Sequence, residues 1–223
     1  MAGLLVLLHL AGGLILPYVL LNSVTAPPGF LENAAPHAAI VRASVVLFLV
    51  AAAVTLGISV AVFPILQPDC PRLALACLAL GIANLPLQVF ESASLLSMLS
   101  LSQKYAAAPP ADTATLEVIA GAVGSARIWA HFTQLLTVVC WISLLYAALW
   151  RASRIPSWLG FAGLVTCALQ IYGVPLRALL GYSAITWMAV PLAPAYLGLA
   201  LWWIIQGLDG GRSRPAQNQR TAL

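Results

Sequence analysis

The chain of 223 residues is 62% hydrophobic and only 7% charged, and its mean hydropathy is +0.97. Soluble domains carry about 25% charged residues, so this composition excludes an ordinary soluble domain and indicates an integral membrane protein. Ten Lys and Arg residues against six Asp and Glu residues give a net charge of +4. The basic residues occur singly, at the ends of apolar stretches and in the C-terminal tail. Nucleic-acid binding needs a denser basic patch than this.

A helix of about 20 mostly apolar residues spans a bilayer, and the sequence contains six such stretches. We predict an all-α fold, a polytopic membrane helix bundle in one domain over residues 1–208, followed by a polar tail at 209–223 that we expect to be disordered and cytoplasmic. The predicted spans are residues 4–21, 38–66, 73–101, 126–150, 158–179 and 183–206. No Lys or Arg precedes the first stretch, so we expect a retained helix, although residues 23–26 resemble a signal cleavage site.

The connections alternate in length. Residues 22–37 and 102–125 form two longer links on one side, and we expect a short interfacial helix to begin after Asp112 in the second. Lys and Arg in short loops favour the cytoplasmic side of a membrane. The short links and the tail carry most of the loop arginines, so we predict that both the N-terminus and the C-terminus are cytoplasmic.

Two polar stripes interrupt the third and fourth apolar stretches. Each has polar side chains at i, i+4 and i+7, which places them on one face of a helix. The first stripe is Asn84, Gln88 and Glu91, and the second is Arg127, His131 and Gln134. Ionisable groups are expensive inside a membrane and tend to face the protein interior, a partner or a water-filled cavity. The stripes are therefore the candidate site.

Counting along the predicted spans places both stripes near the outer edge of the hydrocarbon layer. Arg42 begins the second span at that level and Arg177 ends the fifth. The zone is positive on balance, and guanidinium groups bind phosphate and carboxylate in a bidentate fork. A kink at Pro86 favours an open pocket between the third and fourth spans over ordinary kinked packing. We therefore expect the protein to bind or handle a lipid-like, anionic amphiphile in an outer-leaflet pocket.

Two other interpretations remain open. Glu91 and His131 are the candidate catalytic residues of a membrane enzyme that uses acid–base chemistry on a lipophilic substrate. Alternatively, a Glu91–Arg127 pair clamps two helices together in a structural or accessory subunit. Transport of small solutes is disfavoured because ionisable groups do not continue through the inner half, where His9 stands alone. The sequence leaves open whether the protein is an enzyme.

Motifs for metals and cofactors are missing. Four cysteines include no CxxC pair and have no histidine at ligand spacing, so we predict no metal site. The sequence has no GxGxxG, phosphate loop, GxSxG or HExxH motif, so no cofactor is predicted. The expected partners are membrane lipids and the amphiphilic ligand, and the oligomeric state is open.

Several sequence segments are similar to those of a known family. They are Ser100 to Tyr105, Ala126 to Trp129, Leu145-Tyr146, and the stretch from Trp150 to Gly160 that contains Arg154-Ile155-Pro156-Ser157-Trp158. Over about residues 35–210 the chain resembles a bacterial multi-pass membrane family described only as a domain of unknown function. The resemblance implies a bundle of about six helices in a bacterial cytoplasmic membrane. It implies no activity, so no functional residue is transferred from it.

Overall fold

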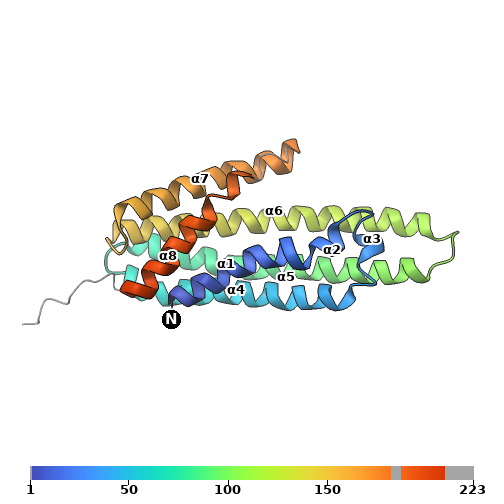
Figure 1. Ribbon diagram of the computed structural model, residues 1–223, viewed down its shortest axis with the longest axis horizontal. Helices are drawn as coiled ribbons and strands as arrows, with labels where there is room; N and C mark the ends of the chain where they lie inside the picture. The colour runs from blue at the N-terminus through green and yellow to red at the C-terminus, as the bar shows by residue number, and fades with distance from the viewer. Residues whose placement is uncertain (1, 182–186, 209–223) are drawn as a thin grey trace, which may run out of the picture.

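The computed structural model describes residues 2–181 and 187–208, and every regular element in this part of the chain is a helix. The longest helices run close to antiparallel along the length of the molecule, and the last two helices are tilted against them (Figure 1). Their bounds are α1 Ala2–Ile15, η1 Leu16–Leu20, α2 Asn22–Thr25, α3 Phe30–Asn33, α4 Ala38–Leu66, α5 Pro71–Ala107, α6 Thr113–Arg151, α7 Ser157–Leu180 and α8 Leu192–Gln206.

Five helical segments in the described residues are long and apolar enough to cross a membrane: α4, α5, α6, α7 and Trp187–Gln206, which contains α8. The protein is therefore an all-helical, multi-pass membrane protein, and the predicted fold class is confirmed. The first predicted span corresponds to α1, an apolar helix of 14 residues that continues directly into the π-helical turn η1. The beginning of the sixth predicted span and the predicted disordered tail lie outside the described residues.

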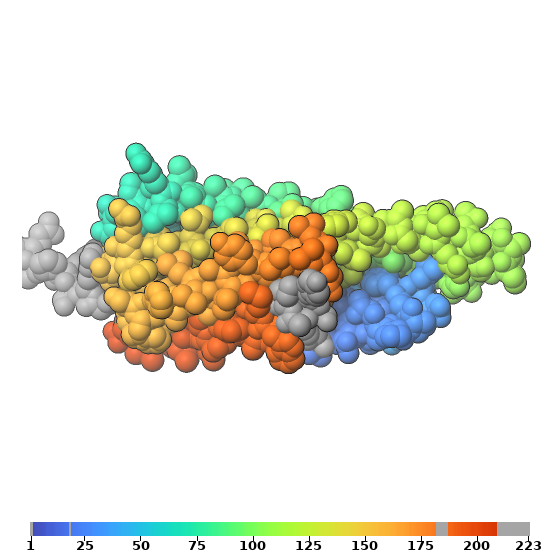
Figure 2. All heavy atoms as spheres, turned by 90° about the horizontal axis from the view of Figure 1, so that it is seen from above, coloured from blue at the N-terminus to red at the C-terminus, as the bar shows by residue number. Residues whose placement is uncertain are grey.

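The helices α5 and α6 form a hairpin that is much longer than a bilayer is thick. At about 1.5 Å per residue, the 37 residues of α5 extend about 55 Å, against about 30 Å of hydrocarbon. The prediction of a long link at 102–125 is wrong, because only residues 108–112 separate the two helices. Ala, Leu, Gln and Glu in this segment are strong helix formers, and only Pro109 and Pro110 break the helix. The hairpin tip therefore projects beyond the other helices (Figure 2).

A repeat of seven residues positions α5 in the bundle. Buried residues recur along α5 in alternating steps of three and four, the pattern that packs helices as in a coiled coil. They are Ala74, Cys77, Gly81, Asn84, Gln88, Glu91, Leu95, Met98 and Ser102. The polar stripe is thus the middle section of a buried seam that faces α6 and α4.

One end of the bundle, which we name the near end, holds the short turns between α4 and α5 and between α6 and α7. Arg154 in the second turn donates to Asp69 in the first at 3.1 Å, and the Trp202 indole donates to the Arg154 carbonyl oxygen at 3.1 Å. The start of α1 and the end of α8 meet here, because Gly3 packs against the backbone of Ala200 (Figure 1). The largest apolar core begins at this end and includes α1, α4, α5, α6, α7 and α8.

The opposite end, the far end, is closed by the first connection. Residues 22–37, predicted as a link, fold into α2 and α3 and lie against α5. Gly29 caps the N-terminus of α3 with φ of +131°, a conformation that favours glycine. The backbone N–H of Ala35 donates to Ser102 Oγ at 2.8 Å, and Val24 packs with Leu99. The α3 segment is thereby fixed beside the hairpin.

Candidate functional site

The centre of the candidate site is a buried carboxylate. Glu91 on α5 is completely buried, and one of its oxygens lies 2.8 Å from Nδ1 of His131 on α6. Gln88, one turn earlier on α5, donates to the other Glu91 oxygen at 3.1 Å. The side chain of His131 is 32% exposed. Both carboxylate oxygens are therefore satisfied inside the protein, while the imidazole remains partly exposed.

A second hydrogen bond links the two stripes toward the near end. The Gln134 amide on α6 donates to Asn84 Oδ1 on α5 at 3.1 Å. Pro86 lies between Asn84 and Gln88, and α5 continues through it without a break. Asn84, Gln88 and Glu91 are each at most 2% exposed. The two predicted stripes therefore face each other as a packed layer. Pro86 has no N–H to donate to the carbonyl oxygen four residues earlier, and the hydrogen bonds of the stripes do not go to that carbonyl but join side chains to each other.

Arg127 occupies a different position from the one predicted. No ion pair joins it to Glu91, whose partner on α6 is His131 at 2.8 Å. The short turn at 108–112 fixes the hairpin register, because Tyr105 donates to Glu117 and Glu91 then lies opposite His131. Arg127 is therefore one helical turn closer to the hairpin tip. The predicted Glu91–Arg127 clamp is wrong, and a Glu91–His131 contact takes its place.

The guanidinium of Arg127 lies under α3. Its central carbon is 5.8 Å from the centre of the Phe30 ring, within the range of a cation–π contact. The Nε atom of Arg127 is buried and has no hydrogen-bond partner. A buried donor without an acceptor carries a desolvation cost of about 1–3 kcal/mol. Arg127 is thus a cation with unused hydrogen-bonding capacity beside the buried carboxylate layer.

The other two predicted arginines do not join this cluster. Arg42 on α4 is exposed, and no hydrogen bond or ion pair links it to Glu91 or Arg127. Arg177 is exposed near the end of α7, which packs on α6 and α8 and diverges from the α5–α6 hairpin at this end (Figure 1). The structure therefore gathers six of the eight predicted residues and leaves Arg42 and Arg177 at the periphery.

The helices also define how far the cluster lies from the near end. Glu91 follows Arg72 on α5, and His131 precedes Arg151 on α6, by about 20 residues each, which is about 30 Å of helix. This distance matches the thickness of the hydrocarbon layer. Arg127 lies about one turn further. If Arg72 and Arg151 mark one membrane boundary, Glu91 and His131 mark the other, and Arg127 lies at head-group level.

A second polar layer nearer the middle of the bundle was not predicted. The Trp141 indole donates to Ser59 Oγ at 2.8 Å, and Ser59 donates to the Thr55 carbonyl oxygen at 2.8 Å. His9 is not isolated, because its ring lies edge-on to Trp141 at 5.5 Å and to Tyr196 at 5.6 Å. The missed signal was the seven-residue repeat, which places Trp141 on the same α6 face as Gln134.

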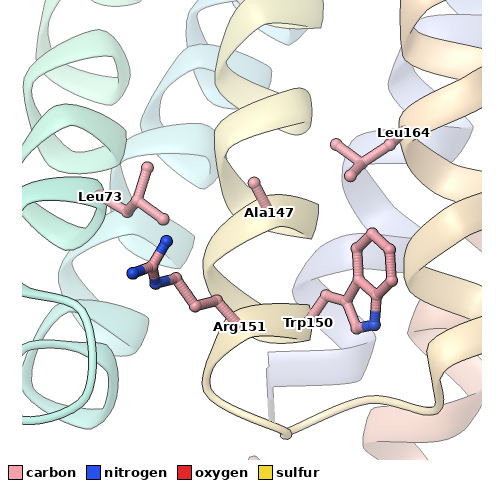
Figure 3. Close-up of a pocket in the computed structure, with 5 residues that line it drawn as sticks. All are labelled: Leu73, Ala147, Trp150, Arg151 and Leu164. Atoms are coloured by element: carbon pink, nitrogen blue, oxygen red, sulfur yellow. The ribbon is translucent and has the colours of Figure 1, made fainter.

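The structure outlines a cavity away from the polar stripes. It has a volume of about 270 Å³, is located at the near end, and is lined by Leu73, Ala147, Trp150, Arg151 and Leu164 (Figure 3). Within residues 2–181 and 187–208, no group of three or more His, Cys, Asp or Glu side chains is placed to hold a metal ion, and all four cysteines are free thiols.

Chemically, the cluster has two separate capacities. The first is an oriented imidazole, since Glu91 fixes Nδ1 of His131 and the ring remains partly exposed. A base oriented by a carboxylate is a recurring arrangement in acid–base catalysis. The second is anion binding by Arg127, whose planar guanidinium suits phosphate and carboxylate groups. Phe30, which covers this guanidinium, had no signal in the sequence.

The comparisons with known proteins identify the family and no activity. No curated protein and no solved structure matches the chain. A family model matches residues 1–207, which includes α1 and extends the sequence resemblance to the N-terminus. The chain therefore belongs to the family described as Domain of unknown function (DUF4386).

Proposed function

We propose that this membrane protein binds or handles an anionic amphiphile at the far end of the α5–α6 hairpin, with Arg127 holding the head group. The observation that carries the proposal is the Arg127 guanidinium, which has a buried Nε without an acceptor and lies against Phe30. A phosphate or carboxylate oxygen supplies the missing acceptor. Charge-assisted hydrogen bonds of this kind are about twice as strong as neutral ones.

The depth of Arg127 supports a lipid-like ligand. About 24 helical residues separate it from Arg151, so it lies roughly 36 Å along α6 from the near end. This distance exceeds the hydrocarbon thickness of about 30 Å and falls within the polar head-group region. Apolar side chains beside it on α6, such as Ile128 and Trp129, are 50% exposed and suit contact with acyl chains. An amphiphile suits this place because its anionic head group can contact Arg127 while its acyl chain contacts the exposed apolar side chains.

The test is native mass spectrometry of the protein purified from membranes containing phosphatidylglycerol. We expect wild type to retain this lipid and Arg127→Gln to retain about fivefold less, the effect of about 1 kcal/mol per basic residue. Lys104→Gln is the matched control, because it removes the same charge from the exposed hairpin tip. Equal retention by wild type and Arg127→Gln, with both proteins folded, contradicts the proposal.

The proposal includes a location and an orientation. We place the protein in a bacterial cytoplasmic membrane with both termini in the cytoplasm, so that Arg127 faces the outer leaflet. The near end carries Arg72, Arg151 and Arg154, which the positive-inside rule assigns to the cytoplasmic side. Labelling of a cysteine introduced at Ser97 or Lys104 by an impermeant maleimide in intact cells tests this orientation. Labelling that occurs only after cell lysis would show that the protein has the opposite orientation.

A second candidate function rests on the 2.8 Å contact between Glu91 and His131. In this candidate, His131 is a general base or acid toward a lipophilic substrate, and Glu91 orients its ring. Wild type reconstituted in phosphatidylglycerol vesicles would then generate new lipid species, whereas Glu91→Gln would not, at nearly unchanged thermal stability. If wild type generates no new species and Glu91→Gln only lowers stability, the contact is a helix clamp of a structural subunit.

A further inference from the structure

The cavity at the near end is a groove on the outside of the bundle. Ala147 on α6 forms its floor, Leu73 on α5 and Leu164 on α7 form the two sides, and Trp150 and Arg151 lie at its end (Figure 3). The groove exists because Ala147 is small and α6 separates α5 from α7. Its volume of about 270 Å³ is slightly below the roughly 300 Å³ of the smallest drug-sized pockets, so it accepts part of an amphiphile.

The end of the groove is basic. Arg151 is exposed and forms no ion pair with any residue in the described ranges 2–181 and 187–208, and its guanidinium extends toward the α5 side of the groove (Figure 3). Arg72 is also exposed and directly precedes Leu73 in the first turn of α5, at the same end of the bundle. Arg154, by contrast, is engaged with Asp69 at 3.1 Å. Arg151 and Arg72 therefore provide positive charge at this end that no described carboxylate neutralises in an ion pair.

The indole of Trp150 is held in place by its neighbour on α7. A Cβ atom at Gly160 would lie only 2.6 Å from Trp150 Cγ, so the ring rests directly on the glycine backbone. The adjacent turn is fixed as well, since the Arg154 N–H donates to the Leu149 carbonyl oxygen at 2.9 Å. Trp side chains favour the boundary between hydrocarbon and head groups. The groove thus has a rigid wall at interfacial depth.

We infer that this groove binds an anionic phospholipid of the near-end leaflet, with one acyl chain over Ala147 and the phosphate against Arg151. Charge selects the occupant: an apolar channel that ends in a guanidinium complements a chain attached to an anionic head group. Basic pockets between membrane helices recognise anionic lipids in this way. The site lies about 30 Å from Glu91 along the helices and is independent of the Arg127 proposal.

The head-group test uses nanodiscs of equimolar phosphatidylglycerol and phosphatidylcholine, followed by native mass spectrometry. It is performed in wild type and in an Arg127→Gln background, so that lipid at the far end is counted separately. We expect preferential retention of phosphatidylglycerol, about fivefold weaker in Arg151→Gln. Arg151→Lys keeps the charge and should retain most of the lipid, and Lys104→Gln should match its background. Equal retention of the two lipids, or no loss in folded Arg151→Gln, overturns the inference.

The acyl-chain test fills the groove without changing its charge. Ala147 is only partly buried, so Ala147→Leu projects into the groove instead of the core. We expect this variant to lose phosphatidylglycerol as Arg151→Gln does, while the small Ala147→Ser variant retains it. Loss in Arg151→Gln with full retention in Ala147→Leu would mean that only the surface charge binds lipid, which overturns the groove site. A dimer that covers this face and excludes lipid overturns it as well.

Discussion

The two ends of the bundle are held together by different interactions. At the far end, α5 and α6 contact each other through a buried carboxylate, an imidazole and three amides. At the near end, glycines on α7 bring large aromatic side chains of α6 close to the neighbouring backbone, as at Gly163 and Tyr146. Lipid is as apolar as leucine, so helix association in a membrane relies on close packing and interhelical hydrogen bonds. The far end relies on a buried layer of polar side chains, whereas the near end combines close glycine contacts with single hydrogen bonds, such as Tyr146 to the Ala195 carbonyl oxygen.

This difference has a functional consequence. At Gly163, close packing against the Tyr146 ring leaves no room for a ligand. The far-end layer instead includes ionisable side chains, two of which, His131 and Arg127, are only partly buried. We therefore expect a variant of the Gly163–Tyr146 contact to change stability alone, and variants of the far-end layer to change both stability and ligand binding. The predictions below test this difference.

The largest effect is expected at Glu91. Glu91→Ala removes the acceptor of both His131 and Gln88 and leaves a small cavity at a fully buried position. Because His131 remains partly exposed, we expect a loss near the lower limit for a broken buried pair, about 3 kcal/mol of unfolding free energy. Steric-trapping measurements in bicelles provide this value. Ser97→Ala is the control on the exposed side of α5 and should cost under about 0.5 kcal/mol.

A smaller loss is expected at the near end for Gly163→Ala. The new Cβ atom would lie 2.6 Å from Tyr146 Cγ and would displace a ring whose hydroxyl donates to the Ala195 carbonyl oxygen at 2.7 Å. Overpacking of this kind costs about 1–3 kcal/mol, and we expect about 2. Thermal unfolding in detergent measures it.

Gly57→Ala is the matched control for this substitution. A Cβ atom at Gly57 meets nothing within 4 Å, so the better helix propensity of alanine should stabilise α4 slightly. If Gly163→Ala is as stable as Gly57→Ala, or if it weakens phosphatidylglycerol retention at Arg127, the proposed difference between the two ends is wrong.

The sequence identified which residues form the far-end layer, but it did not identify which of them contact each other. Spacing at i, i+4 and i+7 correctly placed Glu91 and His131 on facing helix surfaces. The partner of Glu91 depended on the hairpin register, which the turn length determines. A link of 24 residues leaves the register undefined, whereas the observed turn at 108–112 allows only one. Hydropathy could not reveal this, because it predicts contact with lipid and says little about where a helix ends.

Other features depended on tertiary contacts that a single sequence does not encode locally. Phe30 is an ordinary apolar residue in a segment predicted as a link, and only the folding of α3 against α5 brings it to Arg127. The sequence does not show which aromatic side chains pack on Gly160 and Gly163, because those partners lie on another helix. The groove over Ala147 is formed by three helices and by the small size of one side chain. The sequence contains no motif that predicts such a groove.

A smaller effect is expected for the layer between the two ends. Trp141→Phe removes the donor to Ser59 Oγ and should lower the unfolding free energy by about 1 kcal/mol, the usual net value of such a hydrogen bond. Ser59→Ala removes the same bond from the other side. The double variant should therefore lose less than the sum of the two. Additive losses would show that the indole is held by packing alone.

The smallest effect is expected at the hydrogen bond between Gln134 and Asn84. Interhelical bonds in membrane proteins contribute about 0.6 kcal/mol on average, so Gln134→Leu and Asn84→Leu should show a coupling of this size in a double-mutant cycle. The value decides how far the far-end layer acts as a unit. A coupling well above 1 kcal/mol would mean that the amide pair and the Glu91–His131 pair stabilise each other. Ligand binding at Arg127 would then depend on the whole layer. A coupling near 0.6 kcal/mol, with unchanged lipid retention in Gln134→Leu, would confine binding to Arg127 and its immediate neighbours.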